Sequence, residues 1–229
     1  MVMKRIFLLS AIVLISFSTF AQDKGISSTM VKQVKAHMTY GIKAGLTFAN
    51  AASFNPGSTT NFYAANSVTS FYLGGVIDIP IFSVLSVQPG LTLIGKGSEI
   101  VGSEGNKKYL PWYLEIPVNV LGNVKVGPGK LFFGAGPYLG IGVFGGYKDS
   151  FGSRIIRYGT NTELSGVDND LKSLDVGLNF LLGYQLNNGL NVHGGYGLGL
   201  TNVAANSGIS GDTSSFKNKL FSLGLGFAF

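Results

Sequence analysis

The chain has 229 residues, of which only 12% are charged and 34 are glycine. Charged residues make up about 25% of an average soluble domain, so this composition argues against an ordinary soluble globular protein. Cysteine is absent, which excludes a disulfide framework, a cysteine-ligated metal and a lipid anchor on a cysteine. The net charge of +6 is spread along the chain without a basic cluster, so no nucleic-acid partner is expected.

The first segment has the pattern of a secretory signal peptide. Lys4 and Arg5 precede an almost wholly apolar stretch, 6–20, and small residues stand before a cleavage site after Ala21. We therefore expect residues 1–21 to be a cleaved signal peptide that directs export. Residues 22–36 are polar, have no clear period and are expected to form a short periplasmic lead-in to a single domain, 37–229.

Beyond residue 22, no apolar run approaches the roughly 18 residues that a membrane-spanning helix needs. Hydrophobic residues still make up 45% of the chain. They alternate with glycine and polar residues, and period-two alternation is typical of strands with one apolar face. The predicted strands are 37–48, 69–79, 85–96, 109–121, 131–143, 173–186, 190–203 and 219–229.

The connections between these strands are alternately long and short. Long polar connections are predicted at 49–68, 97–108, 147–172 and 204–218, and short ones at 81–83, 122–130 and 187–189. The last short connection predicts a three-residue hairpin loop with Gly189 at positive φ. Long outer loops and short periplasmic turns are typical of bacterial outer-membrane barrels. The sequence thus predicts an all-β fold, an eight-stranded antiparallel up-and-down transmembrane β-barrel, closed by pairing of 219–229 with 40–48.

Three prolines fall inside the predicted strands: Pro89, Pro117 and Pro137. Every strand of a closed barrel has two neighbours, so each proline removes one donor from a hydrogen-bond ladder. We therefore expect β-bulges at these prolines, or strand ends closer than the alternation indicates.

Charged side chains within the strands lie on the face opposite the aliphatic residues, and would face the lumen. They are Lys43, Asp78, Lys96, Glu115, Asp175, His193 and Lys219. An eight-stranded barrel is just wide enough for side chains to fill it, and burying unpaired charges is costly. We therefore expect a paired polar network, with ion pairs between Lys43 and Asp78 and between Lys96 and Glu115. A proton or ion path, or a small polar ligand site, is an alternative interpretation.

The sequence does not indicate a catalytic, cofactor or metal site. His193 is the only histidine well inside a strand, since His37 lies at the entrance to the first. No clustered carboxylates accompany His193 to make a metal site. Neither histidine has an evident pairing with serine and aspartate, as nucleophilic catalysis would need. We therefore expect no enzymatic activity.

Several short motifs resemble those of the PorT-like outer-membrane β-barrel proteins of Gram-negative bacteria. They are SVQPGL at 86–91, GKG at 95–97, YLEIP at 113–117, GPY at 136–138 and YGLGLTN at 196–202. The resemblance extends over about 40–229 and rests on the order and spacing of the motifs. It implies a barrel embedded in outer-membrane lipid, and it implies no particular activity.

The last strand, 219–229, resembles the signal that the outer-membrane insertion machinery reads during assembly. The residues that carry this resemblance are Ser222, Gly224, Phe227 and Phe229. The resemblance implies that the insertion machinery is a transient partner.

We expect a monomeric barrel with a structural or interaction role. Its long loops carry aromatic residues that offer contacts to an extracellular partner, namely Phe54, Phe62, Tyr63, Phe151 and Tyr158. One alternative is a soluble periplasmic lipocalin-like barrel that binds a small apolar ligand, and another is a narrow channel. Face polarity separates the first two, because a lipocalin is apolar inside and polar outside.

Overall fold

The computed structural model describes residues 38–51, 64–102, 105–159, 171–204 and 216–229. The chain divides into two units, 1–38 and 39–229. The predicted signal peptide and lead-in, 1–21 and 22–36, lie outside the described residues, as do Phe54, Phe62 and Tyr63. No helix within the described ranges has the length and apolar character needed to cross a membrane.

The second unit is a single sheet of ten strands. They are β1 (Thr39–Ala51), β2 (Ala64–Phe82), β3 (Leu85–Gly95), β4 (Ser98–Gly102), β5 (Gly105–Val126), β6 (Gly129–Asp149), β7 (Gly152–Ile155), β8 (Leu174–Leu186), β9 (Leu190–Gly199) and β10 (Asn218–Ala228).

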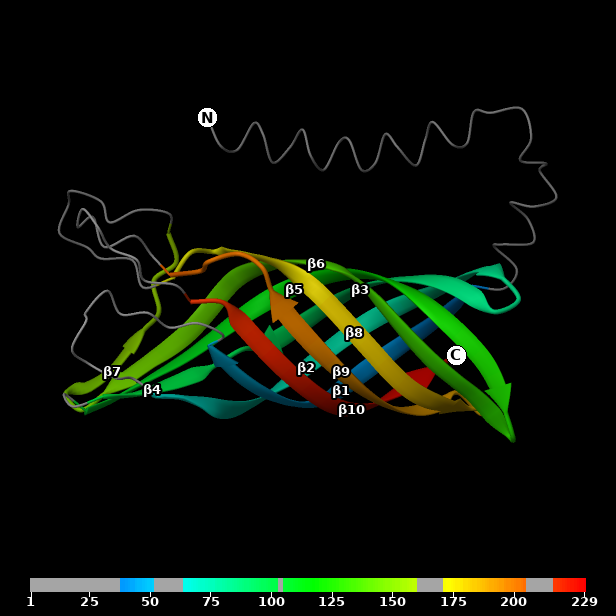
Figure 1. Ribbon diagram of the computed structural model, residues 1–229, viewed down its shortest axis with the longest axis horizontal. Helices are drawn as coiled ribbons and strands as arrows, with labels where there is room; N and C mark the ends of the chain where they lie inside the picture. Colours follow the sequence, from blue (N-terminus) through cyan, green and yellow to red (C-terminus); the bar gives the residue numbers. More distant parts are fainter. Residues whose placement is uncertain (1–37, 52–63, 103–104, 160–170, 205–215) are drawn as a thin grey trace, which may run out of the picture. The chain divides into compact units, whose positions relative to one another are not determined.

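Eight of these strands close into a ring, which Figure 1 shows from the side. Around the ring the order is β1, β2, β3, β5, β6, β8, β9 and β10, and every neighbouring pair is antiparallel. The closing pair, β1 with β10, runs from Gly41 opposite Ala228 to Ala51 opposite Asn218. This confirms the predicted eight-stranded up-and-down barrel and its closure by the last strand.

The outer face is apolar and the inner face is polar or small. In β1, Ile42 and Leu46 are 55% and 52% exposed, whereas Thr47 and Ala49 are buried. The same alternation places Leu223 and Leu225 of β10 on the outer surface. This polarity is the reverse of a lipocalin, so the lipocalin-like alternative does not fit the structure.

Two predicted loops contain paired strands. Residues 97–108, expected to be a loop, include β4 paired with the start of β5, from Ser98 opposite Tyr109 to Gly102 opposite Gly105. Beyond its predicted end, β6 continues to Asp149 and pairs with β7. These extensions lack a period-two pattern, because above the membrane a strand has no lipid-facing side and polar residues occur on both faces.

The predicted bulges at Pro89, Pro117 and Pro137 are absent from the three strand pairs in which these prolines are matched. All three prolines lie inside strands, in register with the neighbouring residues. The register shifts lie instead between Pro80 and Phe82 and between Trp112 and Tyr113. A proline removes a single donor, and the bonds on either side of it hold the register of a long ladder.

The loop between β8 and β9 has the predicted length of three residues. Gly189 has φ of 92°, and its N–H donates to the carbonyl of Leu186 at 3.0 Å. An L-residue with a side chain rarely adopts this φ, so glycine is needed to bring Leu186 and Leu190 into adjacent strands.

Aromatic side chains form a band at each end of the outer surface. Near the long-loop end, Trp112 contacts Phe71 edge-on and stacks on Phe144, with centroid separations of 4.5 and 5.5 Å. At the other end, Phe227 and Phe229 are 5.9 Å apart. Such bands mark the membrane interfaces of outer-membrane barrels, whose short turns face the periplasm. By this rule β4 and β7, at the left of Figure 1, lie at the extracellular end.

Candidate functional site

The centre of the lumen holds a buried triad of Lys96, Glu115 and Asp175. Lys96 follows β3 directly, and the two carboxylates come from the inner faces of β5 and β8. Lys96 Nζ lies 2.8 Å from Glu115 Oε2 and 3.0 Å from Asp175 Oδ2, and the three side chains are at most 5% exposed. The predicted ion pair between Lys96 and Glu115 is confirmed. Asp175 joins it from a strand that neighbours neither β3 nor β5.

Neutral side chains donate further hydrogen bonds to both carboxylates. Asn218 (2.9 Å), Tyr138 (3.3 Å) and Thr201 (3.3 Å) donate hydrogen bonds to Asp175, and Asn179 (2.9 Å) donates to Glu115. The Lys96 ammonium also lies 4.1 Å from the centroid of the Tyr138 ring, a cation–π contact. Because the buried charges are paired and hydrogen-bonded, the network can hold the barrel walls together instead of destabilising them.

A second polar contact crosses the lumen nearer the periplasmic end. Tyr72 Oη lies 2.6 Å from His193 Nε2, and His193 Nδ1 lies 2.8 Å from Asn191 Oδ1. A neutral imidazole fits both bonds, since Nδ1–H can donate to the amide oxygen while Nε2 accepts from the tyrosine hydroxyl. His193 is therefore fully partnered by uncharged groups.

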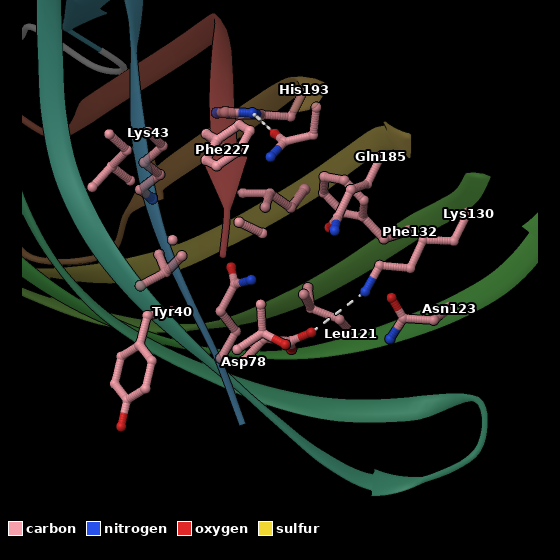
Figure 2. A pocket seen from close by; sticks show the side chains of 18 residues that line it. Tyr40, Lys43, Asp78, Leu121, Asn123, Lys130, Phe132, Gln185, His193 and Phe227 are labelled. Atoms are coloured by element: carbon pink, nitrogen blue, oxygen red, sulfur yellow. Dashed lines mark hydrogen bonds and ion pairs between the residues drawn. The ribbon is translucent and has the colours of Figure 1, made fainter. Parts of the chain in front are cut away.

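The periplasmic mouth contains a cavity of about 50 Å³, large enough for about three or four water molecules. Asp78 of β2 and Lys130 of β6 approach each other across this mouth, with Oδ2 and Nζ 3.5 Å apart (Figure 2). Tyr40 projects away from the cavity in the same view. Lys43 lines this cavity and also the inner cavity that Glu115 lines.

The predicted ion pair between Lys43 and Asp78 is wrong. In the β1–β2 register, Asp78 is opposite Thr39, whereas Lys43 is opposite Gly74. The two side chains are thus four rungs apart, and Asp78 pairs with Lys130 from the far wall of the barrel. The narrow lumen makes a contact across the barrel shorter than one along the strand.

Lys219 does not face the lumen. It is exposed on the outer face of β10, opposite Asn50 of β1, while its neighbours Asn218 and Leu220 are buried inside. Lys219 lies two residues above the outward-facing Phe221, at the extracellular end of the strand. A lysine there can bury its aliphatic chain against the barrel and keep its ammonium in the polar headgroup region.

Tyr72, Tyr138, Thr201 and Asn218 belong to the lumen contacts and were not among the predicted site residues. The alternation places Tyr72 and Tyr138 on the inner face, which is the only signal that the sequence offers. It does not indicate which inward residues meet across the lumen, because that depends on the stagger of strands far apart in the chain.

An apolar cluster fills the extracellular end of the lumen. It consists of Tyr147, Ile156, Leu171, Val203 and Phe216. Tyr158 lies beside it, and its hydroxyl donates to the carbonyl of Phe144 at 3.0 Å. Burial raises the pKa of Tyr158, so its hydroxyl stays protonated and can keep this bond. The lumen is thus polar at its centre and apolar towards the cell exterior.

Within the described part of the chain, no three histidine, cysteine, aspartate or glutamate side chains gather as a metal site would require. Lys96 forms ion pairs with both buried carboxylates, and His193 contacts Tyr72 and Asn191. These contacts suit a structural network that crosslinks the walls.

A closed antiparallel ring, an apolar outer belt between aromatic bands and a polar core together define a transmembrane β-barrel. The chain belongs to the outer membrane protein beta-barrel domain family, whose model matches residues 20–205. It is therefore an integral protein of the outer membrane, as predicted, and its lipid environment follows from the family. A search of curated proteins finds no match.

Solved structures that are similar at low sequence identity include Ail, Neisserial surface protein A and OprG. Ail of Yersinia pestis is 13% identical with a TM-score of 0.39, over 84% of this chain and 99% of that chain. Neisserial surface protein A is 13% identical with a TM-score of 0.43, over 83% and 97%. OprG of Pseudomonas aeruginosa is 14% identical with a TM-score of 0.45, over 83% and 95%.

Proposed function

We propose that the protein is a non-catalytic outer-membrane barrel, plugged by its own side chains, that acts as a structural or interaction component at the cell surface. The observation that carries this proposal is the triad of Lys96, Glu115 and Asp175, which joins β3, β5 and β8 across the lumen. A network in which the charges are already paired holds the centre of the barrel closed.

One side of the barrel is taller than the other, and this taller side supports a role at the cell surface. β2, β5 and β6 contain 19, 22 and 21 residues, whereas a spanning strand needs about 9–11. Their upper parts, with β4 and β7, form a wall above the extracellular interface. At its tip, Phe151 is 97% exposed. Its turn is held by hydrogen bonds from the N–H groups of Phe151 and Gly152 to Asp149 Oδ1, at 2.9 and 3.0 Å.

Conductance in planar bilayers tests whether the paired side chains close the lumen. We expect no steady conductance from the wild-type protein and measurable openings from the triple variant Lys96→Ala, Glu115→Ala, Asp175→Ala. The matched control replaces Lys125, Lys130 and Asp78, charged residues of the periplasmic end, by alanine. Steady conductance by the wild-type protein would favour the narrow-channel alternative.

We also propose that residues 1–21 form a cleaved signal peptide, that 22–36 form a periplasmic lead-in, and that the barrel is a monomer. N-terminal sequencing of the protein from outer membranes is expected to begin at Gln22. Light scattering of the detergent-solubilised protein is expected to give the mass of one chain. A retained leader or a stable dimer would contradict the respective part.

The terminal strand supports a role of Ser222, Gly224, Phe227 and Phe229 in insertion. Phe227, near the end of β10, and Phe229, directly after it, are both exposed and contact each other in the periplasmic aromatic band. We expect the double variant Phe227→Ala, Phe229→Ala to accumulate in the periplasm. The control, Phe221→Ala with Phe48→Ala, removes two phenylalanines from the opposite end and should insert. Normal insertion of the first variant would refute the assignment.

Membership in the PorT-like group is proposed on the order and spacing of its motifs, such as SVQPGL at 86–91 and YLEIP at 113–117. The first motif lies in β3, which Lys96 follows directly, and the second lies in β5 and includes Glu115. A phylogeny of outer-membrane barrels that places the chain outside the PorT-like group would contradict this assignment.

A further inference from the structure

Two lysines face each other on the outer surface of the wall. Lys108 of β5 and Lys148 of β6 are directly opposite in the strand register. Four residues along each strand, Trp112 and Phe144 stack on the same outer face. Like charges directly opposite each other on one face of a sheet are destabilising, so this pair needs an explanation.

No carboxylate of the described residues forms an ion pair with either lysine. Glu99 is opposite Lys108 on the other side, but its Oε1 accepts a hydrogen bond from Asn106 at 3.4 Å. Asp149, next to Lys148, accepts the backbone N–H groups of its own turn. Neither lysine therefore forms an ion pair among the described residues, and Glu99 is the one carboxylate directly opposite either of them in the described strand register.

The same two strands contain a second pair of opposed lysines, which can be compared with the first. At their periplasmic end, Lys125 and Lys130 are also directly opposite each other. There Asp78 lies 3.5 Å from Lys130 and supplies the negative charge. Among the described residues, the periplasmic pair thus includes an ion pair with a carboxylate of the protein, and the extracellular pair does not.

The height of Lys108 and Lys148 above the membrane interface indicates which molecule supplies a negative charge to them. Four residues of a tilted strand raise the lysines about 10 Å above Trp112. Tryptophan side chains of barrels lie at the interface, next to the headgroups. We propose that Lys108 and Lys148 together bind a phosphate group of the outer-leaflet glycolipid, lipid A, whose acyl chains lie against Trp112 and Phe144.

The two lysine ammonium groups suit a phosphate group that is bound from one side. A phosphate presents several acceptor oxygens, and each lysine ammonium offers three donors and one positive charge. The bound anion relieves the repulsion between the lysines, and the apolar face below accepts the acyl chains. Binding therefore needs the phosphate and the acyl chains on the same molecule.

Native mass spectrometry of the folded, full-length mature protein in detergent micelles tests the proposal, with diphosphorylated lipid A as the probe. We expect the wild-type protein to retain lipid A. The variant Lys108→Ala, Lys148→Ala should bind about 25-fold more weakly, a factor of about five for each lysine near a lipid surface. Lys108→Arg, Lys148→Arg should bind as the wild type does.

The matched control, Lys107→Ala with Lys125→Ala, removes the same charge, from β5 alone, and should also bind as the wild type does. Equal binding by the two alanine variants would overturn the proposal. Each variant is first checked for the heat-dependent gel shift of a folded barrel.

Two further parts of the experiment use only the wild-type protein, so they do not depend on whether a variant folds. Lipid A from which both phosphates have been removed should bind at least about tenfold more weakly, since the charge contribution is lost. Inorganic phosphate alone should bind far more weakly than lipid A. Equal binding of dephosphorylated lipid A, or binding of free phosphate as tight as that of lipid A, would overturn the assignment.

Discussion

Tyr72 and His193 hydrogen-bond at 2.6 Å across the lumen, although β1 and β10 separate their strands in the ring. The contact therefore spans the closing seam from the inside. It links β2 to β9, the strands that flank β1 and β10, through two uncharged side chains.

Replacing Tyr72 by phenylalanine should weaken the barrel at this seam. His193 Nε2 would lose its donor in a buried site, which costs about 1–2 kcal/mol. The free energy of unfolding in urea, followed by the gel shift in lipid vesicles, measures this loss. Tyr40→Phe is the control, because Tyr40 projects away from the lumen (Figure 2). Equal stability of the two variants would show that the contact contributes nothing.

Replacing Lys96 by methionine should have a larger effect. Glu115 and Asp175 would be left buried without a countercharge, and breaking a buried ion pair typically costs about 3–5 kcal/mol. The same urea titration measures it, with Lys125→Met as the exposed control. Adding Glu115→Gln and Asp175→Asn to Lys96→Met should recover part of the loss, because the uncompensated charges disappear. If the single and triple variants are equally unstable, charge is not the cause.

The extracellular end offers a steric test at Gly142. A Cβ added there would lie 2.3 Å from the ring of Tyr158, a distance that forces the tyrosine out. We expect Gly142→Ala to expose the Tyr158 segment and to increase its cleavage by chymotrypsin in the folded protein several-fold. Gly146→Ala is the matched control in the same strand, since a Cβ there meets nothing within 4 Å. Equal cleavage of both variants would contradict the packing of Tyr158 into the mouth.

Trp112 is the only tryptophan of the chain and reports on the outer aromatic band. In lipid vesicles we expect its emission to be blue-shifted and quenched most strongly by lipids brominated near the headgroup, because interfacial aromatic residues lie at that depth. Unfolding in urea should reverse both effects. Quenching by deep bromine atoms, or free access of aqueous acrylamide, would contradict the assigned membrane position.

The strand count, the closing pair and the face of each strand could be predicted from alternation, because lipid on one side and a narrow lumen on the other constrain every second residue. That constraint ends at the membrane surface. Alternation therefore does not predict the pairing of β4 with the start of β5. Lys219 itself follows the alternation of β10 and lies on the outer face, so the prediction that placed it in the lumen rested on its charge and not on its position in the strand.

The lumen was predictable only in part. The ion pair of Lys96 with Glu115 joins neighbouring strands, and it can be predicted from their inward faces. The contacts of Asp175 and of Asp78 with Lys130 cross the lumen, and they depend on the stagger of strands that are not adjacent. Nothing local in the sequence encodes that stagger, so these contacts had to come from the three-dimensional structure.

The seam between β1 and β10 joins residues that lie nearly a full chain length apart, such as Gly41 and Ala228. Neither strand can complete its hydrogen bonds until the other has been synthesised and exported, and lipid offers no substitute partners for free backbone groups. Pairs so distant in sequence also form slowly. A truncated chain without β10 would therefore present two unpaired strand edges, and in the cell such edges are targets for proteases and for pairing with other unfinished barrels.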